Sequence, residues 1–193
     1  MNFRLKTYFQ QFKSIEITRT DKLSGLIIYP LGDLIAQLIL GDVSFLRLFF
    51  VALLGRFIYA IEIPKWFGFL ASLKKRNPVT IISQTFWEKE NEQPHLNWLG
   101  KTIGATVWFH PIWIARHMLV IELANIVSGK TDFIEFLPEA LKLGTMSYIG
   151  QFPVAVVVNY IIICKLSEKT RFIWSSVFSG LLAIYYAIGR AYL

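Results

Sequence analysis

The stretch LSGLIIYPLGDLIAQLIL, residues 23–40, decides the fold class of this chain. It contains one charged side chain, Asp33, and is long enough as a helix to cross about 30 Å of hydrocarbon. Four more apolar runs follow, at about residues 45–63, 102–127, 143–164 and 172–189. None alternates with a period of two, which argues against strands of a β-barrel. The runs predict an all-α polytopic membrane bundle with five transmembrane helices, and four helices are the alternative.

The composition of the 193 residues agrees with a membrane protein. Hydrophobic residues make up 54% and charged residues 17%, against about 25% charged in soluble domains. So few charges exclude a disordered chain, and a single cysteine, Cys164, excludes a disulfide scaffold. We predict a basic N-terminal arm at residues 1–22 and one helical bundle at 23–193, with an inner-side loop at 74–97.

The net charge of +7 is unevenly distributed along the chain. With five spans, 14 of the 20 lysines and arginines fall on one side, in the N-terminal arm, in the second link and in the fourth link. Four fall on the other side, namely Arg47, Lys130, Lys142 and Arg190. The positive-inside rule then places the N-terminus on the matrix or cytoplasmic side. Spread over three segments, the basic residues do not indicate nucleic-acid binding, and the expected partner is the lipid bilayer.

Charged groups within the predicted spans need a structural or functional reason, because each costs about 2.5–3.5 kcal/mol on insertion scales. Asp33 in the first span and Arg56 in the second come to similar depth on either side of a tight turn. We expect them to pair, with Gln37 one helical turn after Asp33 on the same face. The pair either fixes the register of two helices or belongs to the polar lining of a pore or substrate site.

The third span carries the densest polar cluster, formed by His110, Arg116, His117 and Glu122. His110 and His117 are seven residues apart and therefore share a helix face with Thr106. This pattern predicts a central helix whose histidines are either hydrogen-bonded in the interior or titrate as proton sensors.

Two other groups of residues are candidates for contacts between helices. Glu62 and Asn159 are expected to converge with His110 on an inner polar cluster, unless Glu62 reaches the interface beside Lys65. The fifth span has small residues at helical spacing, which allow close approach of a helix within the chain or in a partner. This helix-packing set consists of Ser176, Gly180, Ala183 and Ala187.

Motifs for catalysis or metal binding are absent from the sequence. It has neither HExxH nor GxSxG, and the phosphate-loop glycine expected before Ser128-Gly129-Lys130-Thr131 is replaced by Ala124. We therefore expect no enzymatic activity, no cofactor and no metal site.

Several short motifs occur in an order that resembles a known family. They are Gly32-Asp33 with Gln37, Lys101 ten residues before Pro111, Pro138-Glu139-Ala140-Leu141, Pro153 followed by Asn159-Tyr160, and Tyr185-Tyr186. Over about residues 20–188 the chain resembles the family of the mitochondrial inner-membrane protein Mpv-seventeen and the small peroxisomal membrane proteins. Asp21 with Tyr29, the run to Pro111 and Asn159 are also similar to bacterial L-alanine exporters.

The first resemblance implies a multi-span protein of the mitochondrial inner membrane that forms or supports a pore or transport path for small solutes. The bacterial inner membrane is the alternative location. We expect Asp33, Arg56, His110, Arg116 and His117 to line or gate such a path. The alternative functions are a non-catalytic accessory subunit of a large respiratory-type membrane complex and a proton-linked exporter of small amino acids. Partners would be other membrane subunits or further copies of the chain.

Overall fold

The fold was taken from a computed structural model, which describes residues 16–73, 86–90, 93–130, 132–134 and 136–192. It is mostly helical, as predicted, with one two-stranded hairpin. The elements are α2 (Arg19–Leu40), α3 (Phe45–Leu54), η1 (Gly55–Tyr59), α4 (Ala60–Ser72), β1 (Trp87–Glu90), β2 (Gln93–Leu96), α6 (Trp98–Ile103), η2 (Gly104–Phe109), α7 (His110–Val127), α8 (Phe136–Tyr160), η3 (Ile161–Lys165) and α9 (Glu168–Tyr192), where η denotes a π-helix.

The first apolar run forms α2, which starts four residues before the run. Thr18 caps the helix, because its hydroxyl accepts a hydrogen bond from Asp21 N at 3.1 Å and its own N–H donates to the Asp21 carboxylate at 3.0 Å. The last turn ends at Gly41, whose φ of 74° suits a residue without a side chain. The basic arm predicted at residues 1–22 therefore contributes its last four residues to the helix, and residues 1–15 lie outside the described part.

The second, third and fourth runs form helices that contain a π-helical turn, and the fifth run lies within α9. The second run continues through α3, η1 and α4 to Ser72, and the third is built from α6, η2 and α7. The fourth run belongs to α8 and η3, and its helix begins at Phe136, so Pro138 lies in its first turn. π-helical turns accommodate an extra residue and occur frequently at functional sites.

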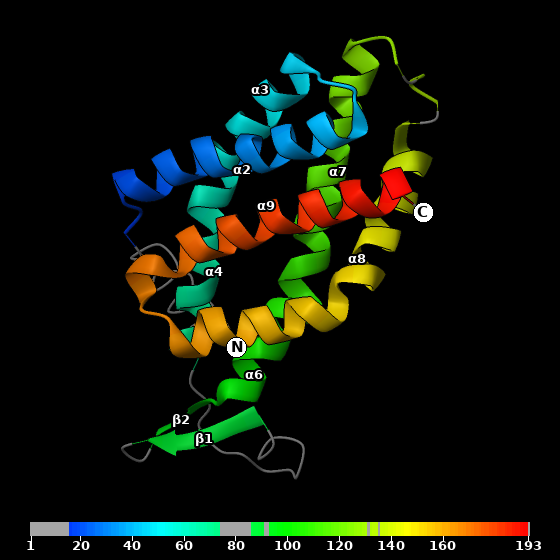
Figure 1. Ribbon diagram of the computed structural model, residues 1–193. Coiled ribbons are helices and arrows are strands. Elements are labelled where there is room, and N and C mark those ends of the chain that lie inside the picture. The colour runs from blue at the N-terminus through cyan, green and yellow to red at the C-terminus, as the bar shows by residue number, and fades with distance from the viewer. Residues whose placement is uncertain (1–15, 74–85, 91–92, 131, 135, 193) are drawn as a thin grey trace.

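In the fold, α2 and α9 lie side by side, run in the same direction, and cross α4 and α7 (Figure 1). α8 returns beside α7 and leads through η3 to the start of α9. The starts of α2 and α9 lie toward one end of the bundle, on the left of Figure 1, and the α2–α3 turn and the end of α7 lie toward the other. The buried core lies between these layers and includes Tyr29, Tyr59, Trp113, Ile114 and Phe172.

The predicted loop at 74–97 contains a β-hairpin that the sequence reading did not anticipate. β1 pairs with β2 in antiparallel register, with Trp87 opposite Leu96. Leu96 is buried against the core, and Asn97 then caps α6 by accepting from Gly100 N at 2.9 Å. The hairpin thus fixes the point at which the third helical run enters the bundle. Residues 74–85 lie outside the described part.

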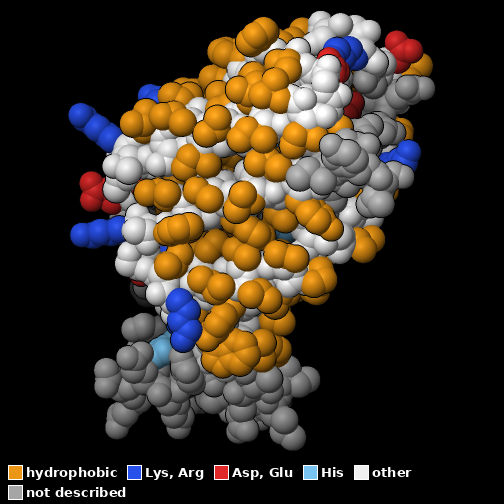
Figure 2. Space-filling model, in the orientation of Figure 1, with side chains coloured by type: hydrophobic (Ala, Val, Ile, Leu, Met, Phe, Trp, Pro, Cys, Tyr) orange, Lys and Arg blue, Asp and Glu red, His pale blue; other side chains and the backbone are white. Residues whose placement is uncertain are grey.

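Large apolar side chains cover much of the outer surface (Figure 2). On α2 they recur every four residues, at Leu23, Ile27, Leu31 and Ile35, and so form one outward-facing stripe. Within the described residues two helices, α2 and the continuous Phe136–Lys165, are long and apolar enough to cross a membrane. The sequence predicted five spans, and the difference has a physical basis in at least two runs. The run through α3, η1 and α4 carries Arg47, Arg56, Glu62 and Lys65, and α7 carries two histidines, Arg116 and Glu122.

Candidate functional site

The candidate site is a row of polar side chains on one buried face of the helix α6–η2–α7. Thr102, Thr106 and His117 are 2%, 1% and 8% exposed. His110 lies between Thr106 and His117 on the same helix, half-buried. We call this row of four residues the polar stripe. The predicted sharing of a face by Thr106, His110 and His117 agrees with this arrangement. Because burial of polar groups is unfavourable unless they find partners, the contacts of the stripe are informative.

At the C-terminal end of the stripe, His117 contacts Tyr59 from η1. Tyr59 Oη lies 3.4 Å from His117 Nδ1 and 3.4 Å from the carbonyl oxygen of Trp113. The His117 ring stacks on Trp113 at 5.5 Å between centroids, and Tyr59 packs against Tyr29 at 4.9 Å. The sequence reading missed Tyr29, Tyr59 and Trp113. Their burial could not be inferred from a run in which nearly every residue is apolar.

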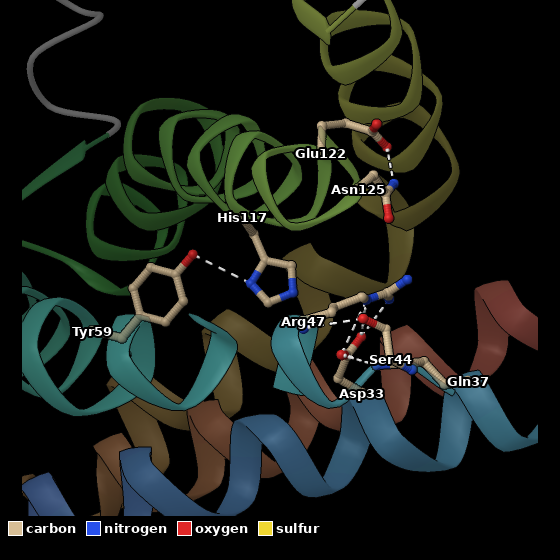
Figure 3. A network of polar contacts seen from close by, with 8 residues as sticks. All are labelled: Asp33, Gln37, Ser44, Arg47, Tyr59, His117, Glu122 and Asn125. Carbon is tan, nitrogen blue, oxygen red and sulfur yellow. Dashed lines mark hydrogen bonds and ion pairs between the residues drawn. The ribbon is translucent and has the colours of Figure 1, made fainter. Parts of the chain in front are cut away.

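The other side of His117 faces a network around Asp33, which is 2% exposed (Figure 3). Arg47 Nε donates to Asp33 Oδ1 at 3.0 Å and Oδ2 at 3.1 Å, and a second guanidinium nitrogen also pairs with Oδ1. Gln37 Nε2 donates to Asp33 Oδ2 at 2.7 Å, as expected for its place one turn later. Gln37 Oε1 accepts from Ser44 N at 2.6 Å, and Ser44 caps α3. We call Asp33, Gln37, Ser44 and Arg47 the clasp.

The predicted pair of Asp33 with Arg56 is therefore wrong. Arg47 and Arg56 are nine residues apart, which places them on nearly opposite faces of a helix with 3.6 residues per turn. Arg47 lies on the face of α3 that packs against α2. Asp33 lies farther from the α2–α3 turn than Arg47 does, and the long Arg47 side chain reaches across that distance. Arg56 instead lies with its guanidinium carbon 5.6 Å from the centre of the Phe57 ring. By its position beside the turn, Arg47 counts among the four outer-side charges.

The predicted inner cluster of Glu62, His110 and Asn159 does not form as a unit. Glu62 pairs with Arg116, which joins α4 to α7, and both side chains are partly exposed. Asn159 Nδ2 donates to Thr106 Oγ1 at 3.1 Å and so joins α8 to the polar stripe. His110 stacks on Trp113 at 5.9 Å and lies 6.1 Å from the Tyr148 ring. Glu122 is buried on another face of α7, where its Oε1 accepts a hydrogen bond from Asn125 Nδ2 at 3.1 Å.

Four polar atoms beside the stripe are buried and make no hydrogen bond within the described part of the structure. They are Tyr29 Oη, His110 Nε2, Trp113 Nε1 and Gln151 Oε1. Buried polar atoms usually have a partner, so a group of exceptions needs an explanation such as a water molecule or a bound solute. His110 and Trp113 lie on α7 between Thr106 and His117, and Tyr29 and Gln151 face this stretch from α2 and α8.

The predicted helix-packing set on α9 makes its contact within the chain at Gly180. A Cβ atom placed on Gly32 of α2 would lie 2.5 Å from Gly180 Cα, so the two backbones approach closely. Ser176 is fully buried, and its hydroxyl donates to the Phe172 carbonyl at 2.9 Å. Ala183 is half-buried, and the Ala187 side chain lies outside the described part.

No family model, no curated protein and no solved structure matches this chain.

Proposed function

We propose that this chain is an integral membrane protein that carries a transport path for small polar solutes or protons along the polar stripe of α6–η2–α7. The observation that carries the proposal is the stripe itself, a set of buried and half-buried polar residues that begins at Thr102 and ends at His117. At about 1.5 Å per residue, these fifteen steps correspond to about 22 Å, the larger part of the thickness of a hydrocarbon core.

A membrane environment is supported by the outer surface. Exposed apolar side chains cover the face of Figure 2 from α2 across α9 to α8. Soluble monomers rarely expose contiguous apolar patches above a few hundred Å². Charged side chains instead lie toward the rim of this face in Figure 2. We place the N-terminus on the matrix or cytoplasmic side, because Lys and Arg are concentrated in the segments at that end.

In the conformation described, the path is closed. The clasp satisfies both oxygens of Asp33, and aromatic rings pack on either side of His117. The buried atoms without hydrogen bonds, between Thr106 and His117, are where water or a solute would bind. A closed path with unsatisfied polar groups at its centre fits a gated passage better than a permanently open pore.

The test is solute flux into vesicles that contain the purified chain. We expect flux of small polar solutes or protons above that of empty vesicles, and a decrease in the variant Thr106→Val. That substitution keeps the side-chain shape but removes the hydroxyl that bonds Asn159. Thr145→Val is the matched control, since Thr145 is exposed on α8 and bonds only its own helix, at the Leu141 carbonyl.

Two results would contradict the proposal. One is flux no greater than that of empty vesicles, and the other is flux that Thr106→Val and Thr145→Val leave equally unchanged. The size of the particle after mild detergent extraction adds a second readout. A large assembly together with absent flux would favour an accessory subunit of a membrane complex.

A further inference from the structure

A surface groove lies between α6–η2 and α8. Its volume is about 250 Å³, and its walls include Trp98, Ile103, Val107, Phe152, Val157 and Tyr160. Trp98, Val107 and Val157 are each at least half exposed. The groove is therefore apolar and partly open to the surroundings of the bundle. Two π-helical segments border it, with η2 in one wall and η3 directly after Tyr160.

One end of the groove is basic. Lys165 Nζ lies 5.6 Å from the centre of the Tyr160 ring, and that ring packs edge-on against Trp98 at 5.5 Å. Cys164 Sγ lies 3.8 Å from the Trp98 carbonyl oxygen, and Lys101, Lys165 and Arg171 all lie near this thiol. Glu168 offsets part of the charge, because it pairs with Arg171 at 3.6 Å. The basic end thus carries more positive than negative charge and has aromatic rings at its edge.

We propose that the groove binds one acyl chain of an anionic phospholipid, with the lipid phosphate held by Lys101 and Lys165. The walls offer no polar surface, which suits a hydrocarbon chain and does not suit a peptide backbone with its obligatory hydrogen bonds. The volume is below that of a typical site for drug-sized ligands, about 300–1,000 Å³, but it accommodates part of a single chain. Lysines beside tryptophan and tyrosine are typical of the membrane interface, where lipid headgroups lie.

This inference rests on the membrane location in the proposed function, and it also connects the lipid to the transport path. The Thr102 and Thr106 side chains line the base of the groove, and Thr106 bonds Asn159 of α8. An acyl chain in the groove would pack across this joint between η2 and α8. The lipid would thus support the helix pair that holds one end of the polar stripe.

The experiment uses quenching of tryptophan fluorescence by brominated acyl chains. The full chain is reconstituted in phosphatidylcholine vesicles that contain a minor fraction of brominated lipid, either phosphatidylglycerol or phosphatidylcholine. We expect stronger quenching by the brominated anionic lipid, and we expect this difference to be lost in Trp98→Phe. Trp174→Phe is the matched control, because Trp174 is equally exposed on α9 but does not line the groove.

The variants Lys101→Gln and Lys165→Gln test the headgroup site. Each lysine near a membrane surface contributes about 1 kcal/mol toward anionic lipid, so each variant should lower the relative affinity about fivefold. Equal quenching by both lipids in the unmodified chain would overturn the inference, as would a preference that survives Trp98→Phe. If the chain does not insert into vesicles at all, the proposed membrane location fails as well. Solute flux is measured on the same vesicles, so absent flux with intact lipid preference would refute only the transport path.

Discussion

Removal of Arg47 from the clasp should destabilise the bundle strongly. The substitution Arg47→Met keeps a long side chain but leaves the Asp33 carboxylate, 2% exposed, without its cation. Loss of one partner from a buried ion pair costs about 3–5 kcal/mol, because the remaining charge stays buried and uncompensated. Gln37 still donates to Asp33 in the variant, so we expect about 3 kcal/mol, at the lower end of that range.

The reverse substitution, Asp33→Asn, should cost less. Asparagine can still accept a hydrogen bond from Gln37, and the Arg47 side chain is 21% exposed and can reach polar surroundings at the α2–α3 turn. We expect about 1–2 kcal/mol, the cost typical of a weakened buried hydrogen-bond network. The double variant has no unpaired buried charge. Its loss in free energy of unfolding should therefore be about 2 kcal/mol smaller than the sum of the losses in the two single variants.

The measurement is equilibrium unfolding in mixed micelles, followed by tryptophan fluorescence, for the two single variants and the double variant. Arg56→Met is the matched control, since it removes the same residue type nine positions later from the opposite face. We expect this control to change the free energy of unfolding by no more than about 0.5 kcal/mol. A coupling energy below about 0.5 kcal/mol, or an Arg56→Met cost as large as that of Arg47→Met, would refute the clasp.

The remaining predictions concern helix packing and the second ion pair. Gly32→Ala should destabilise by about 1–3 kcal/mol, since its Cβ would lie 2.5 Å from Gly180 Cα. Gly180→Ala should be neutral or stabilising in the same unfolding assay, because its Cβ would lie 3.5 Å from the nearest atom and alanine favours helix. Equal losses of stability in Gly32→Ala and Gly180→Ala would show that the two backbones do not approach as described. Glu62→Gln should cost less than about 1 kcal/mol, because Glu62 and Arg116 are 40% and 26% exposed and remain accessible to solvent or headgroups. A larger loss would mean that the surroundings of this pair exclude water.

The sequence predicted the helical class and the helix face of the polar stripe, but it did not predict most partners across helices. Periodicity indicates which residues share a face, and this was sufficient for Thr106, His110 and His117. It contains no information on which neighbouring helix a face meets. The number of residues from the α2–α3 turn suggested Arg56 as the partner of Asp33, because both residues are about equally far from the turn. The helix that starts at Ser44 instead directs Arg47 toward Asp33.

The hairpin and the three π-helical turns were also beyond the sequence reading. β1 and β2 are each four residues long and lie in a polar link. Their sequences have no alternating apolar pattern that would predict strands. The π-helical turns lie inside uniformly apolar runs, where an extra residue per turn leaves no sign in composition. Buried aromatic residues such as Tyr59 and Trp113 could not be separated from outward-facing ones for the same reason.

The geometry also indicates where the proposed path would open. The clasp has hydrogen bonds of 2.6–3.1 Å and joins α2 and α3, which are neighbours through a tight turn. By contrast, Tyr59 and His117 approach at 3.4 Å, with Tyr59 on the π-helical segment η1. A π-helical turn can return to α-helical geometry only if the residues that follow it rotate, and this would turn Tyr59 away from His117. The clasp would then hold α2 and α3 in register while the contact between η1 and α7 changes. Tyr59 is therefore better placed than Asp33 to gate the proposed path.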